Sequence, residues 1–424
     1  MRLIFLNRFF HPDHSATSQM LSDLAFALAC EPEASVVVIT SRQRYDAPMD
    51  TLPARETVGG VAIHRVWTSR FGRRNLIGRS IDYVTFYASA LCRLWSLARR
   101  GDVVIAKTDP PMLSVIAAPV CWGRHIQLVN WLQDIFPETA EALGIGGRAA
   151  RGPLRLLRRL RGHSLCIAAM NVVLGQRMAE HVARLGVSAA RIRILPNWAD
   201  GTSIAPIPPA GNALRREWGL GDAFVVGYSG NLGRAHEIGT MLAAMTQLEQ
   251  EETGTAAPDR RPVRWLFVGS GALLDELKAE AARRGLTSVR FAPYQPKERL
   301  AESLSAADVH LVSLRPELEG LVVPSKIYGI AAAGRPTVFI GDEDGEIARL
   351  IAHFKCGLTV AAGDGEGLAR TLRDLADNPD ACCWMGERAR QAFDAELDKP
   401  IAVARWRELL AEVADGEPRG RRVH

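Results

Sequence analysis

The sequence lacks the motifs by which several large classes of protein are recognised. Its seven cysteines show no metal-ligand spacing, and only Cys382 and Cys383 are adjacent, so we expect reduced thiols in a cytoplasmic protein. Charge or glycine interrupts every apolar run before it reaches the length of a transmembrane helix. Serine-nucleophile, zinc-protease, Cys-x-x-Cys, P-loop and dinucleotide-fingerprint motifs are also absent. These absences argue against the common hydrolase, zinc, redox and P-loop classes.

What the chain contains is a regular alternation of short apolar segments with helical periodicity. A chain of 424 residues is too long to fold around a single hydrophobic core. The alternation predicts parallel α/β sheets. The pattern stops at the proline-rich stretch 204–211 and then restarts, which indicates two domains and a linker. The expected strands are residues 3–6, 35–40, 61–66, 103–107, 126–130, 166–173 and 192–195, then 224–228, 265–268, 289–291, 309–313, 337–340 and 358–360.

The predicted architecture is two Rossmann-like, doubly wound parallel sheets. Ligands of such folds bind at the carboxyl edges of the strands, so we expect a central cleft that both edges face. The first domain is expected over residues 1–198, the linker over 199–214 and the second domain over 215–398. An amphipathic helix containing Trp406 follows the last strand.

The stretch 324–336 is the most informative part of the sequence. Proline suits a first helical position and Gly334 suits a left-handed cap, so a helix of about ten residues is expected between them. Ser325 and Lys326 at its start would offer N–H groups and a positive charge to a phosphate, and Glu319 would accept hydrogen bonds from sugar hydroxyls. This combination is typical of a nucleotide-sugar site. The alternative is an ordinary helix start.

Two glycine turns follow expected strands in the second half. Gly230 and Gly233 would let a phosphate approach the backbone, and Arg234 would bind it with a charged fork. Gly269 and Gly271 form another turn at a strand end, which is a weaker signal. A tight strand-to-helix turn without a ligand is the alternative interpretation of the first.

Other candidate residues follow strands in both halves. Small residues at 15–18 would allow a ligand close to the backbone, and Asp134 follows the strand at 126–130. Asp134 also fits a plain helix N-cap. Residues 342–344 match the D-x-D pattern that holds a divalent metal in some sugar transferases. They precede an expected helix, whose dipole acids complement, so we interpret them as a helix start and expect no metal.

The net charge of +5 is distributed unevenly. Between Glu141 and Glu180 there is no acid but there are arginines at 148, 151, 155, 158, 159 and 161, with leucines every three residues. A second acid-free window, between Glu56 and Asp82, holds further arginines. These windows are either solvated faces or a surface for anionic lipid, where each cation contributes about 1 kcal/mol. Nucleic acid is disfavoured because no recognised binding motif accompanies the charge.

Taken in order, these stretches resemble family 4 glycosyltransferases of the GT-B fold, particularly bacterial enzymes of surface-polysaccharide assembly. The resemblance covers nearly the whole chain and is carried by residues 10–12, 134–138, 195–198, 228–234, 268–271 and 319–336. Such enzymes bind the nucleotide sugar mainly in the second domain and the acceptor in the first, and they retain anomeric configuration without a metal. Their last helix crosses back to the first domain, which implies the same for residues 399–416.

The resemblance also implies roles for individual residues. It places Arg234 on the diphosphate, Glu319 near the donor-sugar hydroxyls and Asp134 facing the reacting sugar. The expected catalytic residues are Asp134, Arg234 and Glu319, together with Lys326. The implied donor-binding residues are Ser15, Ala16, Gly230, Asn231, Gly233, Arg234, Gly269, Gly271, Tyr294, Gln295, Glu319, Gly320, Val323, Ser325 and Lys326. The residues assigned to the acceptor and membrane are Arg73, Arg74, Arg155, Arg158 and Arg159.

The sequence departs from the family pattern at two positions. Gly329 stands where a second glutamate usually binds the ribose, and no lysine occurs from Ala235 to Gly239, where the family commonly has one. We expect Lys326 to supply the missing cation from the other loop.

The expected function is that of a metal-independent retaining glycosyltransferase whose donor is a nucleoside-diphosphate sugar, without a further cofactor. Its acceptor would be lipid-linked or an oligosaccharide, and the protein would be cytoplasmic, peripheral on the anionic inner face of the cytoplasmic membrane. A nucleotide-sugar epimerase of the same fold, or a GT-B protein that binds nucleotide sugar without turnover, are the alternatives.

Overall fold

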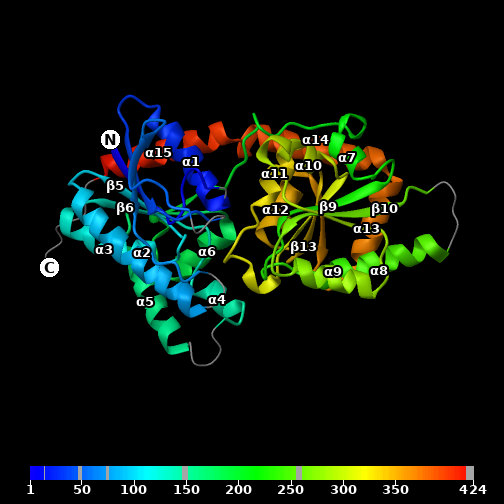
Figure 1. Cartoon of the computed structure of the whole chain (residues 1–424), viewed down its shortest axis with the longest axis horizontal. Helices are drawn as coiled ribbons and strands as arrows, with labels where there is room; N and C mark the ends of the chain where they lie inside the picture. Colours follow the sequence, from blue (N-terminus) through cyan, green and yellow to red (C-terminus); the bar gives the residue numbers. More distant parts are fainter. Residues whose placement is uncertain (14, 46–49, 73–75, 146–150, 255–259, 417–424) are drawn as a thin grey trace. The chain divides into compact units, whose positions relative to one another are not determined.

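The chain forms two units, each built on its own sheet (Figure 1). The computed structural model describes residues 1–13, 15–45, 50–72, 76–145, 151–254 and 260–416. Unit 1 comprises Met1–Pro196 and the chain from Ala402 on, and unit 2 comprises Asn197–Ile401. The predicted α/β class, with two parallel sheets, is confirmed.

Unit 1 contains an eight-stranded sheet in the order β3-β4-β2-β1-β5-β6-β7-β8, parallel except for the β3–β4 pair. Its strands are β1 (Arg2–Leu6), β2 (Ser35–Ser41), β3 (Arg55–Val58), β4 (Val61–Val66), β5 (Val103–Lys107), β6 (Gln127–Trp131), β7 (Met170–Val173) and β8 (Ile192–Ile194). Its helices are α1 (Ala16–Ala29), α2 (Leu76–Leu97), α3 (Leu113–Arg124), α4 (Glu138–Ala142), α5 (Arg151–Ile167), α6 (Gln176–Arg184) and α15 (Lys399–Asp415) from Ala402 on.

Successive residues of a strand point to opposite faces of the sheet, and here the residues on both faces are apolar. Helices therefore cover both faces. Ile4 and Val104 pack in one core with Phe86 of α2 and with α3. Trp131 follows the opposite alternation, and its ring lies 4.6 Å from that of Trp406 in α15. Trp406 is fully buried, so the C-terminal helix is part of the unit 1 core.

Unit 2 contains a six-stranded parallel sheet in the order β11-β10-β9-β12-β13-β14. Its strands are β9 (Phe224–Asn231), β10 (Val263–Ser270), β11 (Val289–Ala292), β12 (Val309–Ser313), β13 (Thr337–Gly341) and β14 (Gly357–Ala361). Its helices are α7 (Ala213–Glu217), α8 (Gly239–Gly254), α9 (Leu274–Arg283), α10 (Leu300–Ser305), α11 (Lys326–Ala332), α12 (Glu346–Phe354), α13 (Gly365–Asp377) and α14 (Pro379–Ala392). Its core includes Trp265, Phe267 and Met245.

The predicted strands differ from the observed ones at two places. The strand expected at 166–173 begins only at Met170, because Cys166 and Ile167 complete α5 and the neighbouring Leu165 buries its side chain. The antiparallel edge strand β3 was not predicted. Its four residues are polar or half-exposed and carry no apolar alternation.

The helix expected from Pro324 is shorter than predicted. It runs from Lys326 to Ala332, and Gly334 adopts the predicted left-handed conformation with φ +62°. Residues 199–214, expected to form the linker, pack on unit 2: the Arg335 guanidinium donates to the Ile207 carbonyl at 2.7 Å, and the Asn212 amide donates to the Glu302 carbonyl at 2.7 Å.

Candidate active site

The carboxyl edge of the unit 2 sheet has a topological switch between β9 and β12. The chain proceeds outward from β9 through β10 and β11, and in the other direction from β12 through β13 and β14. Carboxyl ends of strands at such a reversal form the crevice in which open α/β sheets bind ligands. Gly230 and Asn231 end β9, Gly269 and Ser270 end β10 beside them, and Lys326 reaches this edge from α11. The structure thus brings the main donor-site candidates together.

The two glycine turns interlock. Gly269 has φ +137°, and a Cβ there would lie 2.3 Å from the Gly230 carbonyl oxygen. Gly271 has φ +146°, and a Cβ there would lie 2.4 Å from the Leu232 backbone nitrogen. Only glycine fits both positions, because a side chain at either would collide with the backbone of the neighbouring turn.

Replacing Gly269 with alanine is expected to lower the free energy of unfolding by at least about 2 kcal/mol, because strained backbone and a clash combine. The donor Kd should rise as the turn shifts. Urea unfolding and calorimetric titration with nucleoside diphosphate measure both. Gly254→Ala is the control, since a Cβ there meets no described atom within 4 Å. Equal stability of the two variants would contradict the packing argument.

Lys326 and His236 form a pair at the switch point. The Lys326 ammonium donates to the Asn231 carbonyl at 3.1 Å and lies 3.0 Å from His236 Nε2. His236 Nδ1 lies 2.6 Å from the Ser313 carbonyl, at the end of β12. Because an ammonium and a carbonyl have fixed roles, Nδ1 carries the proton and Nε2 accepts from Lys326. His236 thereby holds the Lys326 ammonium between the ends of β9 and β12.

Burial sets the protonation of this pair. It lowers the pKa of Lys326 to about 8, so the ammonium form prevails at neutral pH. Burial, followed by the charge of Lys326, lowers the pKa of His236 to about 4, which keeps the imidazole neutral. The site therefore presents one positive charge, held by a neutral acceptor.

The remaining candidates for donor binding differ in their exposure and in the hydrogen bonds that they make. Arg234 is exposed and makes no hydrogen bond or ion pair with the described residues. Tyr294 is exposed after β11, and Gln295 donates to the Pro293 carbonyl at 3.0 Å. A Cβ at Gly329 would meet only the Leu304 side chain among described atoms, at 3.5 Å, so packing does not require glycine there.

Glu319 has a structural partner. Its Oε1 accepts from the Glu346 backbone N–H at 2.8 Å, at the first residue of α12. A Cβ at Gly345 would lie 2.6 Å from Glu319 Oε2. Burial, with help from the nearby acids Glu346 and Asp342, raises the pKa of the Glu319 carboxyl. Glu319 thus caps a helix, and any contact with donor sugar would be additional to this role.

The D-x-D stretch closes the turn before α12, as the helix-start interpretation predicts. Asp342 Oδ1 accepts from the Asp344 backbone N–H at 3.0 Å, and both carboxylate oxygens of Asp344 pair with Arg349, at 2.9 and 3.1 Å.

Because these carboxylates are engaged, glycosyl transfer is expected to survive EDTA. Asp344→Asn should change kcat/KM by less than about twofold, since exposed ion pairs contribute little. Initial rates with and without chelator test this. Loss of activity that manganese or magnesium restores would establish a metal-held diphosphate instead.

The carboxyl edge of the unit 1 sheet carries a buried polar network that the sequence did not reveal. Arg8 follows β1, and its guanidinium lies 3.3 Å from Gln43 Oε1 and 3.7 Å from Asp82 Oδ2. Asp82, on α2, also accepts from Ser69 Oγ at 2.7 Å. Thr17 Oγ1 donates to Asp109 Oδ2 at 3.0 Å. Ser15 and Ala16, expected near the donor, begin α1 at this same edge.

Asp134 follows β6 at this edge. Burial raises the pKa of its carboxyl to about 6, against a hydrogen bond from Thr108. Its Oδ1 is buried and has no hydrogen-bond partner among the described residues. It caps no helix, because Pro137 stands at the N-cap of α4. A buried carboxylate with unused acceptor capacity is typical of a functional rather than a structural group.

The predicted basic helix forms, and its arginines divide into two groups. Arg158 pairs with Glu138 and Glu141, and the buried Arg161 also pairs with Glu138. Arg155 and Arg159 are exposed. The proposed lipid contact of Arg158 is thus weakened by intramolecular pairing. Arg73 and Arg74 lie outside the described residues.

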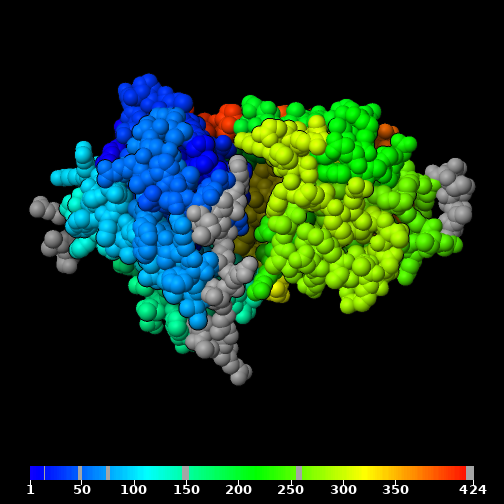
Figure 2. Space-filling model, viewed as in Figure 1, coloured from blue at the N-terminus to red at the C-terminus, as the bar shows by residue number. Residues whose placement is uncertain are grey.

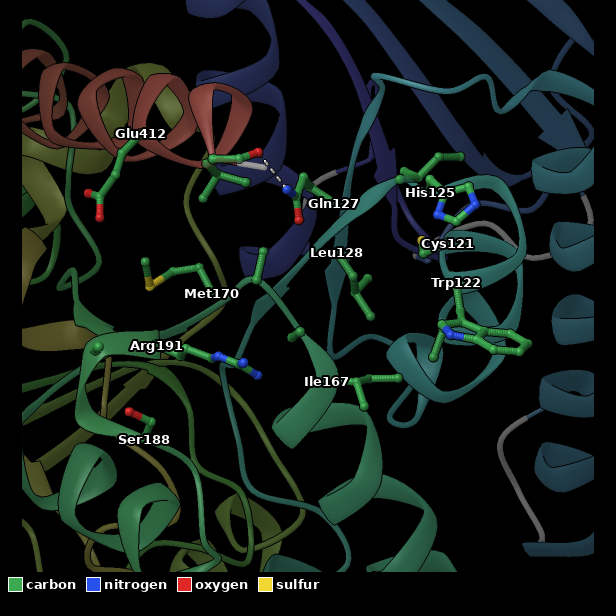
Figure 3. A pocket seen from close by; sticks show the side chains of 17 residues that line it. Cys121, Trp122, His125, Gln127, Leu128, Ile167, Met170, Ser188, Arg191 and Glu412 are labelled. Carbon is green, nitrogen blue, oxygen red and sulfur yellow. Dashed lines mark hydrogen bonds between the residues drawn. The ribbon is translucent and has the colours of Figure 1, made fainter. Parts of the chain in front are cut away.

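A pocket of about 350 Å³ lies at the opposite edge of the unit 1 sheet (Figure 3). Gln127 and Met170, the first residues of β6 and β7, line it together with Glu412 of α15. The Gln127 amide donates to the Gly416 carbonyl at 2.9 Å, and this hydrogen bond connects the residue after α15 to β6. Because ligands of this fold class bind at carboxyl edges, this pocket is no candidate for the active site.

Both halves of the chain match families of known proteins. Residues 16–198 match a glycosyl transferase 4-like domain, and residues 212–392 match glycosyl transferases group 1. The probable glycosyltransferase WbjE of Pseudomonas aeruginosa is 27% identical over 310 residues, 73% of this chain and 74% of that protein. The putative colanic acid biosynthesis glycosyl transferase WcaI of Escherichia coli is 26% identical over 269 residues, 62% of this chain and 64% of WcaI.

The structure of Anabaena HepE in complex with UDP-glucose shares the fold, with a TM-score of 0.70 and 17% identity over 97% of this chain and 100% of that one. The chain therefore belongs to the group 1, GT4-like glycosyltransferases with the GT-B fold. It is a glycosyltransferase that uses a nucleotide-sugar donor. Among the described residues, no helix is both long and apolar enough to span a membrane.

Proposed function

We propose that this enzyme is a retaining glycosyltransferase that moves the sugar of a nucleoside-diphosphate donor to a lipid-linked or oligosaccharide acceptor in cell-surface polysaccharide synthesis. It would act as a peripheral protein at the inner face of the cytoplasmic membrane. The naming of WcaI as a colanic acid biosynthesis enzyme supports the biosynthetic role. The UDP-glucose in the HepE structure supports a nucleotide-sugar donor, although this likeness extends to the fold alone.

The observation that carries the proposal is the placement of Lys326. Its ammonium lies at the switch point and donates to the Asn231 carbonyl, and its side chain lies against Gly230, where a Cβ would be 3.1 Å from Lys326 Cε. The exposed guanidinium of Arg234 belongs to the same strand-to-helix connection as Gly230. Two cations beside glycine turns at the carboxyl edge of the sheet fit a diphosphate.

Catalysis would then depend on stabilising the leaving diphosphate. Charge builds up on it as the glycosidic bond breaks, and fixed cations stabilise that charge without proton transfer. The unused acceptor oxygen of Asp134 would bind a hydroxyl of the reacting sugar. Glu319 would add contacts to the donor sugar while it caps α12.

A panel of nucleoside-diphosphate sugars, incubated with a lipid-linked acceptor in detergent, tests the proposal. We expect one donor to give a glycosylated lipid whose anomeric configuration, read by NMR, equals that of the donor. An isomerised nucleotide sugar would identify an epimerase instead. Tight donor binding without any product would identify a non-catalytic protein.

A further inference from the structure

Three helices form one outer layer of unit 1. Helix α2 packs against α3, and α3 packs against α5, over the sheet face that contains Ile4 and Val104. The surface of α2, azure in Figure 2, faces the viewer there.

This layer exposes no acid among its described residues. The sequences of α2, α3 and α5 contain a single one, Asp82, which is 2% exposed. Asp82 turns inward, accepting from the Phe71 and Gly72 backbone N–H groups, each at 3.0 Å. A solvated helix would gain from acids four residues from its arginines, so their absence needs another cause. The cations of the layer include Arg79, Arg93, Arg124, Arg155 and Arg159, whereas Arg158 and Arg161 pair with Glu138.

The layer also exposes apolar side chains, and on α2 they lie along one side of the helix. On α2, Ile77, Ile81, Val84 and Trp95 are 76%, 38%, 64% and 54% exposed. At 100° per residue they form one stripe, which spans about 27 Å at 1.5 Å per residue. Soluble proteins rarely expose so continuous an apolar face without a partner.

The neighbouring helices continue this pattern. Trp122 of α3 is 79% exposed, and Leu156, Leu160 and Ile167 are exposed on one side of α5. Cations accompany the apolar groups: the Arg124 guanidinium lies 4.7 Å from the Trp95 ring centroid. Arg155 and Arg159 are exposed next to Leu156 and Leu160 in the sequence of α5.

We propose that the outward face of α2, α3 and α5 is the surface that docks on an anionic lipid bilayer, with the α2 stripe (Ile77, Ile81, Val84 and Trp95) embedded. The charge selects this occupant: every acid would be repelled by anionic headgroups, and arginines beside apolar side chains are attracted to them. Tryptophan suits the headgroup boundary because its ring is both apolar and polar. The inference rests on the proposed function in that a lipid-linked acceptor requires the enzyme at the membrane.

Flotation of the full-length protein with vesicles tests the surface. Wild type should bind vesicles of phosphatidylcholine and phosphatidylglycerol, and bind neutral phosphatidylcholine vesicles at least about tenfold less. The variant Ile77→Ser/Ile81→Ser/Val84→Ser should lose about tenfold or more in binding. Trp95→Ser should weaken binding, whereas Trp384→Ser, an equally exposed tryptophan in unit 2, should not.

The contribution of the arginines to vesicle binding is tested by a second set of variants with its own control. Arg155→Gln with Arg159→Gln should weaken binding several-fold at low salt and less at high salt, while Arg370→Gln on α13 should not. Failure of wild type to bind anionic vesicles at low salt overturns the surface. A wild-type dimer that the triple variant turns into a monomer, without vesicle binding, also overturns it and assigns the stripe to a second copy.

Transfer in detergent separates this inference from the proposed function. A protein that glycosylates a lipid-linked acceptor in detergent yet ignores vesicles refutes the docking surface alone. A protein that binds vesicles through α2 yet never uses such an acceptor refutes the acceptor assignment and leaves the surface standing. Unchanged circular dichroism and nucleotide affinity of each variant show that unit 2 and the fold are intact.

Discussion

Replacing Lys326 with alanine is expected to lower kcat/KM about a hundredfold, and Arg234→Ala is expected to do the same. Each removes one charged donor from a preorganised site, and such losses cost about 3 kcal/mol of transition-state stabilisation. Because Lys326 begins α11 and is not part of the hydrophobic core of unit 2, the fold should persist. Initial-rate kinetics with the identified donor measure the effect.

The controls for this prediction carry the same charge elsewhere in unit 2. Lys278→Ala on α9 and Arg370→Ala on α13 remove exposed members of helical ion pairs, which contribute little. They should leave kcat/KM within about twofold of wild type. If the Lys326 and Arg234 variants behaved like these controls, the diphosphate clamp would be wrong.

The rate of transfer is expected to follow a bell-shaped pH dependence in kcat/KM. Burial raises the pKa of Asp134 to about 6, so its carboxylate is lost as pH falls through that value. Burial lowers the pKa of Lys326 to about 8, so its ammonium is lost as pH rises through that value. Activity should therefore be greatest between about pH 6 and 8, since kcat/KM reports groups of the free enzyme.

Asp134→Asn should remove the acid limb and lower kcat about a hundredfold, while Lys326→Arg should keep activity and shift the basic limb upward. Asp134→Asn should also be at least as stable as wild type at pH 7. A raised carboxyl pKa means that folding disfavours the charged form, so ionisation costs stability as pH rises from about 4 to 6. Glu33→Gln, at an exposed site of unit 1, is the control. An acid limb that persists in Asp134→Asn would assign it to another group.

The order of strands and helices could be predicted from local sequence, because the buried strands of parallel sheets are short apolar runs that alternate with helical patterns. Buried apolar strands such as 103–107 and 309–313 were located residue by residue. The error at 166–173 arose because the apolar end of an amphipathic helix and a buried strand look alike over a few residues. β3 escaped because an exposed edge strand needs no apolar residues.

Contacts between distant positions explain what the sequence did not reveal about the site. Lys326 was identified from its own surroundings, but its partner His236 lies 90 residues earlier in the chain. The Arg8–Asp82 contact joins the segment after β1 to helix α2, and no sequence motif links the two. Similarly, the acid-free window gave no sign that Glu138, just before it, would take up Arg158 and Arg161.

The inward position of Asp82 has a practical consequence for work with this enzyme. The Asp82 carboxylate of α2 accepts hydrogen bonds from the loop at 69–72, whereas the side chains of Ile77, Ile81, Val84 and Trp95 are exposed. The two sides of α2 can therefore be altered separately. Serine substitutions along the outer stripe should give a preparation that is easier to purify and crystallise without detergent, with the hydrogen bonds of the inner side preserved.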